Sequence, residues 1–237
     1  MAASSYTITC LRTERIARDI YELEFTKPNG FTFQPGQFVL FDVPLLENPS
    51  DIQTRALSIA SSPKEEALLF IMKMKVGGRI SRWIEEKVRK GTTVKMQGPF
   101  GVFMLDRETD KDYLLVATST GVAPFRSQLF TILPDGLRRI DLVFGVRTEE
   151  DLFWHEEFQN LAKEHTNFFI HFALSEPSEE WKGHHGRVQT LVPQIVNDFS
   201  RRKVYICGSP EMAKEVKDLC FNQWGISKQD LHMEGYI

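Results

Sequence analysis

The feature that most constrains this fold is a change in the spacing of apolar segments near residue 108. Before that point, short apolar or alternating segments are separated by turn residues such as Lys27-Pro28-Asn29-Gly30. Alternation of this kind predicts β-strands, and a series of short strands predicts an antiparallel barrel. One helix is expected among them over 81–90, with Ser81 as its N-cap. The expected strands are Thr7–Cys10, Tyr21–Thr26, Gln37–Val43, Arg55–Ser61, Leu68–Met74 and Thr93–Gln97.

The second half of the chain instead alternates apolar strands with helical segments. Such β–α alternation predicts a parallel, doubly wound sheet. The acidic, turn-prone segment Asp106–Asp112 is the natural linker. We therefore expect an α+β two-domain protein: an antiparallel six-stranded β-barrel over 1–107, then a doubly wound parallel α/β domain over 108–237. The expected parallel strands are Tyr113–Ala117, Ile140–Phe144, Phe168–Leu174 and Lys203–Cys207, with helices near 122–133, 149–164, 187–199 and 210–222.

Composition narrows the class of protein. No apolar run approaches the roughly 20 residues of a membrane-spanning helix, and Met1–Cys10 lacks the pattern of a secretory signal. A net charge of −3 argues against nucleic-acid binding. The three cysteines are too widely spaced for a disulfide framework or a metal site, and too few to hold an iron–sulfur cluster by four cysteines. His184-His185 are expected in a solvated loop. We expect a cytoplasmic protein and make no prediction of its oligomeric state.

The charge is unevenly distributed along the chain. Lys64–Lys95 carries nine Lys and Arg residues against four Glu, whereas Thr148–Glu180 is mostly acidic. One interpretation is two solvated faces. The other is that the basic segment attracts an anionic cofactor or an acidic protein partner.

Three short segments carry residue types suited to phosphate and nucleotide binding. In Arg55-Ala56-Leu57-Ser58, strand alternation is expected to bring the polar ends of Arg55 and Ser58 to one face, although a solvated edge strand fits as well. Gly77-Gly78-Arg79-Ile80-Ser81 opens the expected helix, where backbone N–H groups attract phosphate oxygens. The segment Val116–Phe125 follows the first parallel strand, where open α/β sheets bind dinucleotides, but it lacks the three-glycine fingerprint.

These segments, taken in order, resemble the ferredoxin–NADP reductase family over nearly the whole chain. The flavin signature Arg-x-Tyr-Ser of that family reads Arg55-Ala56-Leu57-Ser58 here, and its Gly-x-x-Ser turn reads Gly78-Arg79-Ile80-Ser81. The nicotinamide loop Gly-Thr-Gly-x-Ala-Pro reads Ser119-Thr120-Gly121-Val122-Ala123-Pro124. Further landmarks of the family are Gln34–Phe38, Gly98–Gly101, Phe144–Arg147, Cys207–Met212 and the C-terminal Met233–Ile237.

The resemblance implies an FAD-dependent oxidoreductase that transfers a hydride between NADH or NADPH and bound FAD. Electrons then pass to or from a small acidic carrier such as ferredoxin or flavodoxin. It implies catalytic roles for Ser58, Cys207 and Glu234, and no metal site. It implies cofactor-binding roles for Arg55, Ala56, Leu57, Ser58, Gly78, Arg79, Ile80, Ser81, Thr120, Gly121, Val122, Ala123, Pro124, Arg147, Ser175, Glu176, Cys207, Gly208 and Tyr236, the last by stacking on the flavin.

Two departures from the family pattern bear on function. Leu57 replaces a tyrosine that packs against the flavin in relatives, which puts flavin affinity, redox poise and the choice of FAD over FMN in question. Ser119 replaces a glycine of the nicotinamide loop. Two alternatives stay open: a reductase of free flavin, and the electron-transfer subunit of a multicomponent oxygenase.

The residues after the third parallel strand bear on the choice of dinucleotide. Relatives that use NADPH often carry Ser-Arg or Thr-Arg there, whereas this chain has Ser175-Glu176. A carboxylate repels a 2′-phosphate and can accept hydrogen bonds from ribose hydroxyls, which predicts a preference for NADH. Arg147, Lys182 and Arg187 are the cations that would offer an alternative phosphate site.

Overall fold

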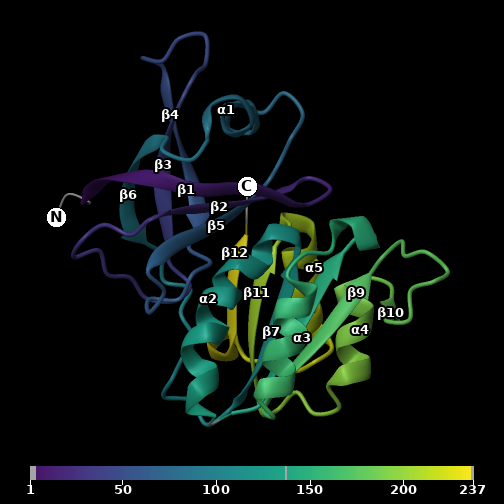
Figure 1. The fold of residues 1–237 in the computed structure, drawn as a ribbon. Coiled ribbons are helices and arrows are strands. Elements are labelled where there is room, and N and C mark those ends of the chain that lie inside the picture. Colours follow the sequence, from purple (N-terminus) through teal and green to yellow (C-terminus); the bar gives the residue numbers. More distant parts are fainter. Residues whose placement is uncertain (1–3, 137, 236–237) are drawn as a thin grey trace. The chain divides into compact units, whose positions relative to one another are not determined.

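The computed structural model describes residues 4–136 and 138–235, which form two compact units (Figure 1). The first unit holds residues up to Leu105 together with Ala123–Thr131. The second holds Asp106–Val122 and the chain from Ile132 onward.

The first unit contains a six-stranded antiparallel sheet with the strand order β4-β3-β6-β1-β2-β5. Beyond the end of β4, the Ala60 N–H donates to the Leu69 carbonyl oxygen of β5 at 2.8 Å. This bond joins the two outer strands, so the sheet closes as the sequence predicts. The strands are β1 (Ser5–Ala17), β2 (Ile20–Thr26), β3 (Phe38–Pro44), β4 (Ile52–Ser58), β5 (Ala67–Lys73) and β6 (Thr93–Phe100).

Aromatic rings fill the core of this barrel. Phe41 packs edge-to-face against Phe25 and Phe70, with ring centroids 5.3 and 5.0 Å apart, and all three rings are fully buried. Helix α1 (Arg79–Lys87) adds Trp83 and Ile84 to the same core. Burial of these large side chains is the main driving force for closing the barrel.

The predicted N-cap of α1 is wrong. The helix begins at Arg79, with Gly78 as the N-cap residue. The hydroxyl of Ser81 instead accepts a hydrogen bond from the backbone N–H of Lys75 at 2.8 Å. It thereby ties the first turn of the helix to the preceding loop.

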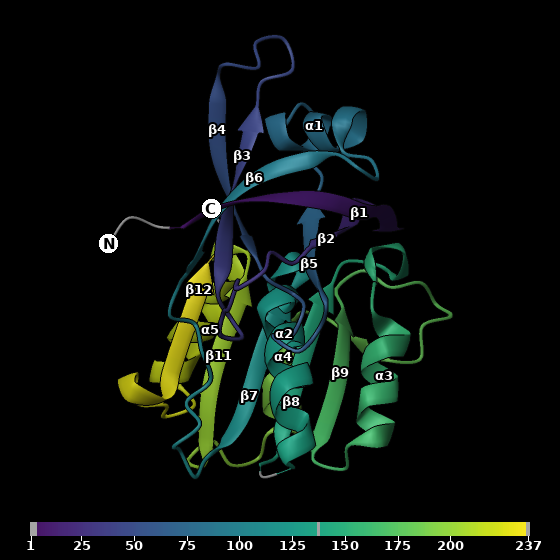
Figure 2. The same ribbon diagram turned by 60° about the vertical axis from the view of Figure 1, so that its left-hand side comes forward.

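The second unit contains a six-stranded parallel sheet with the order β10-β9-β8-β7-β11-β12. Figure 2 shows β12, β11, β7, β8 and β9 in succession across the sheet. The strand order reverses between β7 and β11, and such a reversal is where doubly wound sheets bind nucleotides at their carboxyl ends. The strands are β7 (Asp112–Thr118), β8 (Ile140–Val146), β9 (Phe168–Leu174), β10 (His184–His185), β11 (Arg202–Gly208) and β12 (Leu231–Gly235).

Helices lie on both faces of this sheet. Val192 of α4 (Val188–Ile195) and Val216 of α5 (Pro210–Asn222) share one core with Val143 of β8. Phe144, the next residue of β8, points to the opposite face, where its ring lies 6.3 Å from that of Phe158 in α3 (His155–Glu164). The sheet is therefore doubly wound, as predicted. Helix α2 (Ala123–Ile132) follows β7, and its residues 123–131 are grouped with the first unit.

Some elements differ from the sequence prediction. Strands β10 and β12 were not predicted, because one has two residues and the other has five residues of mixed polarity that are partly exposed. The helix predicted over 149–164 is broken. A capping box between Thr148 and Asp151 closes a short 3-10 turn (Glu149–Asp151), and α3 begins only after Trp154, whose φ is 53°. The helix predicted over 187–199 ends at Ile195.

Candidate functional site

Arg55 and Ser58 lie on the same strand but not on one face of it. They are three positions apart on β4, and regular strand alternation directs such residues to opposite faces. Arg55 is half-exposed and donates to the carbonyl oxygen of Thr54 at 2.9 Å and to the side chain of Gln53. Ser58 is buried at the last residue of the strand. The expectation of one polar row was therefore wrong for this pair.

The two residues between them, Ala56 and Leu57, also differ in burial. Leu57 is 8% exposed and belongs to the barrel core, opposite Val39 in the strand register. Ala56 is exposed and lies opposite Leu40. The side chain of Leu57 packs among the core residues. Its contact with a flavin ring stays a prediction.

The start of helix α1 has features that fit a phosphate group. No side chain caps the helix, and no acidic residue lies in its first turn, so its first N–H groups remain available as donors. Gly77 has a φ of 71°, and a side-chain carbon added there would meet no atom within 4 Å. Arg79 adds a positive charge, and Ile80 and Ser81 complete the first turn. Open space, free donors and a cation together suit the pyrophosphate of FAD.

Arg79 already has a partner within this unit. Its Nη1 and Nη2 atoms each lie 3.0 Å from a different carboxylate oxygen of Asp51. This bidentate bond raises the pKa of Arg79 and lowers the pKa of Asp51. Sequence reasoning missed Asp51, because it lies 28 residues before Arg79 and only the fold brings the two together.

In the second unit, the predicted nicotinamide loop follows the carboxyl end of β7. Ser119 to Val122 form a 3-10 turn that leads directly into Ala123 and Pro124 at the start of α2. Ser119 has a φ of 50°, a left-handed conformation that glycine adopts more readily. The glycine of the family pattern would adopt this conformation without that strain.

Glycines allow this loop to approach the end of β11 closely. A side-chain carbon on Gly121 would lie 2.2 Å from the carbonyl oxygen of Cys207, and one on Gly208 would lie 2.2 Å from Oγ1 of Thr118. Thr118 Oγ1 also accepts the Ser209 N–H at 3.2 Å. Both glycines are therefore required by packing, and Thr118 is a structural residue of this loop that the sequence prediction missed.

Cys207 and Glu234 lie side by side at the carboxyl end of the sheet. They are directly paired in the parallel register of β11 and β12, so their side chains leave the sheet on one face. On that same face, the rings of Tyr205 and His232 stack with centroids 4.7 Å apart. Cys207 is buried and Glu234 is half-buried. The predicted stacking residue Tyr236 lies outside the described residues.

Arg147 and Glu176 form an ion pair across the ends of β8 and β9. Nε and Nη2 of Arg147 each lie 2.8 Å from Oε2 of Glu176, which raises the pKa of Arg147. The backbone joins the same two loops, because the Glu176 N–H donates to the Arg147 carbonyl oxygen at 2.8 Å. Ser175, also exposed, donates its N–H to the carbonyl oxygen of Val146 at 3.1 Å.

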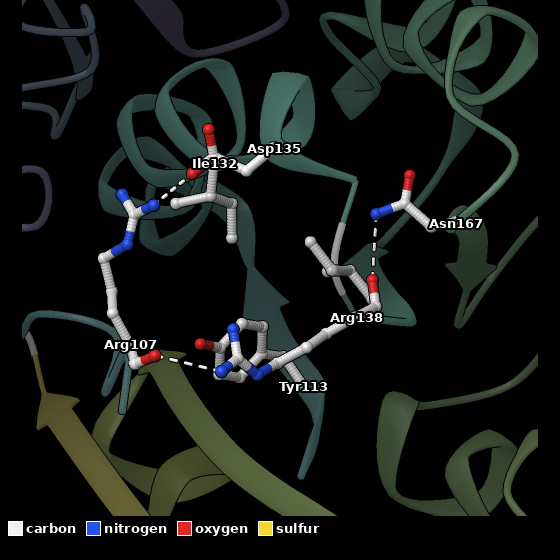
Figure 3. A pocket seen from close by; sticks show the side chains of 7 residues that line it. Arg107, Tyr113, Ile132, Asp135, Arg138 and Asn167 are labelled. Carbon is white, nitrogen blue, oxygen red and sulfur yellow. Dashed lines mark hydrogen bonds and ion pairs between the residues drawn. The ribbon is translucent and has the colours of Figure 1, made fainter. Parts of the chain in front are cut away.

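A small hollow lies at the opposite, amino-terminal edge of the parallel sheet. Figure 3 shows Arg138 beside the ring of Tyr113, with its guanidinium directed toward the carbonyl oxygen of Arg107. Arg107 in turn pairs with Asp135. The cavity volume is about 20 Å³, room for about one water molecule, so this hollow is too small for a nucleotide. Within the described residues, no group of three or more His, Cys, Asp or Glu side chains is placed to hold a metal ion.

Comparison with known proteins agrees with this two-part arrangement. The family "Oxidoreductase FAD-binding domain" matches residues 8–105, and the family "Oxidoreductase NAD-binding domain" matches residues 115–218. Ferredoxin–NADP reductase B of Sorangium cellulosum is 31% identical over 226 residues, which cover 92% of this chain and 91% of that protein.

Two further proteins extend the comparison to oxygenase systems. The ferredoxin–NAD(P)(+) reductase component of the naphthalene 1,2-dioxygenase system from Pseudomonas putida is 27% identical, over 96% of this chain and 68% of that protein. The crystal structure of the Amycolatopsis cytochrome P450 reductase GcoB superposes with a TM-score of 0.89 at 25% identity, over 98% of this chain and 70% of that one.

An antiparallel barrel joined to a doubly wound sheet with nucleotide-binding features defines an FAD-dependent NAD(P)H oxidoreductase. The chain belongs to the ferredoxin reductase-like family. FAD and NAD(P)H are accordingly its cofactors. Across the described residues, none of the helices is both long and apolar enough to span a bilayer.

Proposed function

We propose that this reductase takes electrons from NADH in preference to NADPH and passes them, through FAD, to a small acidic redox protein such as a ferredoxin or flavodoxin. When bound, FAD accepts two electrons as a hydride and releases them one at a time. The protein supplies binding, orientation and exclusion of water. The observation that carries the coenzyme preference is the ion pair between Arg147 and Glu176.

This pair acts against NADPH in two ways. Glu176 lies in the loop after the third parallel strand, where it would repel a 2′-phosphate. Arg147 is the cation nearest in the fold to that carboxylate, and its guanidinium is already engaged by it at 2.8 Å. A 2′-phosphate would therefore have to displace the carboxylate before it gained the charge of Arg147, whereas ribose hydroxyls can donate hydrogen bonds to Glu176.

We also propose which part of the chain binds each cofactor. We place the FAD domain at 1–107 and the nucleotide domain at 108–237. Arg55 and the turn Gly78–Ser81 are proposed to hold FAD, and the loop Thr120–Pro124 with Gly208 to hold the dinucleotide. Ser58 is proposed to donate a hydrogen bond beside the reacting flavin nitrogen, Cys207 to pack against the nicotinamide, and Glu234 to stabilise charge that develops on that ring.

The partner is inferred from exposed basic residues and from the names of relatives. In the segment Lys64–Lys95, eight of the nine cationic residues are exposed and Arg79 is half-exposed. Attraction to an acidic carrier speeds association and weakens as salt is added. Reduction of cytochrome c through an added ferredoxin should slow several-fold between low and high ionic strength, and a rate indifferent to salt would contradict this docking proposal. The three cysteines are buried thiols rather than disulfides, which supports a reducing compartment such as the cytoplasm.

A second candidate is the electron-transfer subunit of an oxygenase. Two relatives are named as reductases of a dioxygenase system and of a cytochrome P450. With three cysteines, this chain cannot itself supply four thiolates to an iron–sulfur cluster. A cluster of that kind would therefore be held by residues outside this sequence. Fast ferricyanide reduction by the isolated protein would show that it is competent alone.

The decisive experiment combines a spectrum with steady-state kinetics. Purified protein should be yellow after gel filtration and release FAD, rather than FMN, on denaturation. Its kcat/KM should be higher with NADH than with NADPH. Colourless protein that reduces added flavin would favour a reductase of free flavin, which is the alternative raised by Leu57. A clear NADPH advantage would refute the coenzyme proposal.

A further inference from the structure

The tip of the β3–β4 hairpin is an ordered turn that reaches helix α1. Within the tip, the Leu45 N–H donates to the Asp51 carbonyl oxygen, and the Asp51 N–H donates to that of Asn48, both at 2.9 Å. Figures 1 and 2 both show α1 beside this hairpin. The tip and the helix belong to the same unit, so their contact is a property of the barrel alone.

Two arginines of α1 bind two carboxylates of the hairpin tip. Arg79 makes the bidentate bond to the Asp51 carboxylate and also lies 3.3 Å from the Asp51 carbonyl oxygen. One turn later, Arg82 contacts Glu47 at 2.7 Å. The two pairs are alike in charge and position, but only Arg79 lies within the Gly78–Ser81 turn that is proposed to hold the pyrophosphate.

The bond between Arg79 and Asp51 uses the donors that a phosphate would use. A guanidinium presents its paired N–H groups in one plane, and a carboxylate and a phosphate both accept them in the same bidentate manner. Asp51 takes one N–H from each terminal nitrogen. The side chain of Arg79 is only 20% exposed, whereas that of Asp51 is 47% exposed, so the carboxylate is the more solvated member of the pair.

We propose that Asp51 competes with the FAD pyrophosphate for Arg79, so that the hairpin tip sets the affinity of the barrel for FAD. This inference rests on the proposed role of Gly78–Ser81 in FAD binding. Without FAD, the carboxylate neutralises Arg79 at the uncapped start of α1. When FAD binds, the phosphate oxygens would take the place of the Asp51 carboxylate on the guanidinium. Asp51 thus weakens FAD binding by the free energy needed to break the existing ion pair.

The test is FAD affinity in full-length variants, measured by quenching of flavin fluorescence in apoprotein. Asp51→Asn should lower the Kd for FAD about fivefold, the value of a well-formed surface ion pair. Asp51→Ser serves as a second variant that also lacks the carboxylate. Glu47→Gln is the matched control, because it removes the same charge from the same turn but leaves Arg79 and Asp51 paired. It should change the Kd less than about twofold.

A double-mutant cycle assigns the effect to Arg79 itself. Arg79→Gln should weaken FAD binding, and Asp51→Asn should then have almost no further effect, since no guanidinium remains to be released. The proposal is refuted if Asp51→Asn leaves the Kd unchanged or raises it. It is also refuted if Glu47→Gln gives an equal gain, or if the gain persists without Arg79. If wild-type apoprotein does not bind FAD, or if Arg79→Gln leaves the affinity unchanged, the proposed flavin site itself is wrong.

Discussion

Cys207 of β11 and Glu234 of β12 are directly paired in the parallel register at the carboxyl end of the sheet. The pairing places a thiol and a carboxyl group on one face, two residues beyond the stacked rings of Tyr205 and His232. A buried thiol can pack against an apolar ring, and a neighbouring carboxylate can balance positive charge on that ring. This pairing is the geometric basis for the roles proposed above for Cys207 and Glu234.

Replacing Cys207 by alanine should slow hydride transfer without loss of FAD. In its proposed role the thiol packs against the nicotinamide, and misplacing reacting atoms by about 1 Å costs about 100-fold in rate. Stopped-flow reduction of the flavin by NADH measures this step directly. The control is Cys220→Ala, since Cys220 is equally buried but lies on α5 in the core of the second unit. Equal transfer rates in wild type and Cys207→Ala would contradict the role of Cys207.

Replacing Glu176 by glutamine should improve the use of NADPH. The change removes a negative charge and releases Arg147 for a 2′-phosphate, so kcat/KM for NADPH should rise about tenfold relative to NADH. Glu180→Gln removes the same charge from an exposed position of the same loop and should leave the ratio within about twofold. If both substitutions changed the ratio equally, the preference would depend on the net charge of the loop rather than on the pair with Arg147.

Replacing Asp141 by asparagine should strongly destabilise the second unit. Its fully buried carboxylate contacts Nη1 of Arg202 at 2.7 Å, Nε of Arg139 at 2.8 Å and Nε2 of His171 at 3.1 Å. Removal of the charge leaves the buried Arg202 uncompensated, at a cost of about 3–5 kcal/mol in the free energy of unfolding. Asp135→Asn breaks an exposed pair with Arg107 and should cost less than about 1 kcal/mol. Urea titration distinguishes the two.

The same carboxylate gives the stability a defined dependence on pH. Burial alone would raise the pKa of Asp141, but hydrogen bonds from His171 and Arg139 and the charge of Arg202 lower it well below its ordinary value. The folded state therefore binds this proton less readily than the unfolded state does. The stabilisation is complete above about pH 5 and is lost as the pH falls below about 4. In Asp141→Asn the acid limb of the stability curve should be flatter, and an unchanged limb would contradict this account.

Replacing Ser119 by glycine should stabilise the protein. The φ of 50° at Ser119 costs about 1–2 kcal/mol for a residue with a side chain, and glycine avoids this cost while losing about 0.5–1 kcal/mol to chain entropy. The net gain should be about 0.5–1 kcal/mol, seen as a higher Tm. Ser119→Ala keeps the strained backbone and should give no gain. An increase in Tm for alanine equal to that for glycine would show that the hydroxyl, not the backbone, is responsible.

Local sequence patterns were enough to predict the two-part architecture. Before Leu105, apolar and polar residues alternate as in β-strands. After it, apolar strands alternate with helical segments. Each of these local patterns can bury its apolar residues in only one kind of arrangement. The barrel, the doubly wound sheet and the placement of Gly77–Arg79 at a helix start were all accessible from such patterns. Strand β12 was not, because it is short and of mixed polarity, and parallel pairing with β11 decides its conformation.

Only the tertiary structure decided which side chains became partners. Asp51 and Arg79 are 28 residues apart, and Arg147 and Glu176 are 29 apart, so no local pattern records either pair. Both pairs place a carboxylate on a cation that a phosphate could otherwise bind. The sequence therefore predicted which segments bind phosphate, and that prediction rests on local patterns. Contacts between segments that are distant in sequence determine how readily Arg79 and Arg147 can exchange a carboxylate for a ligand. Ion pairing depends on the distance between charges in space and not along the chain.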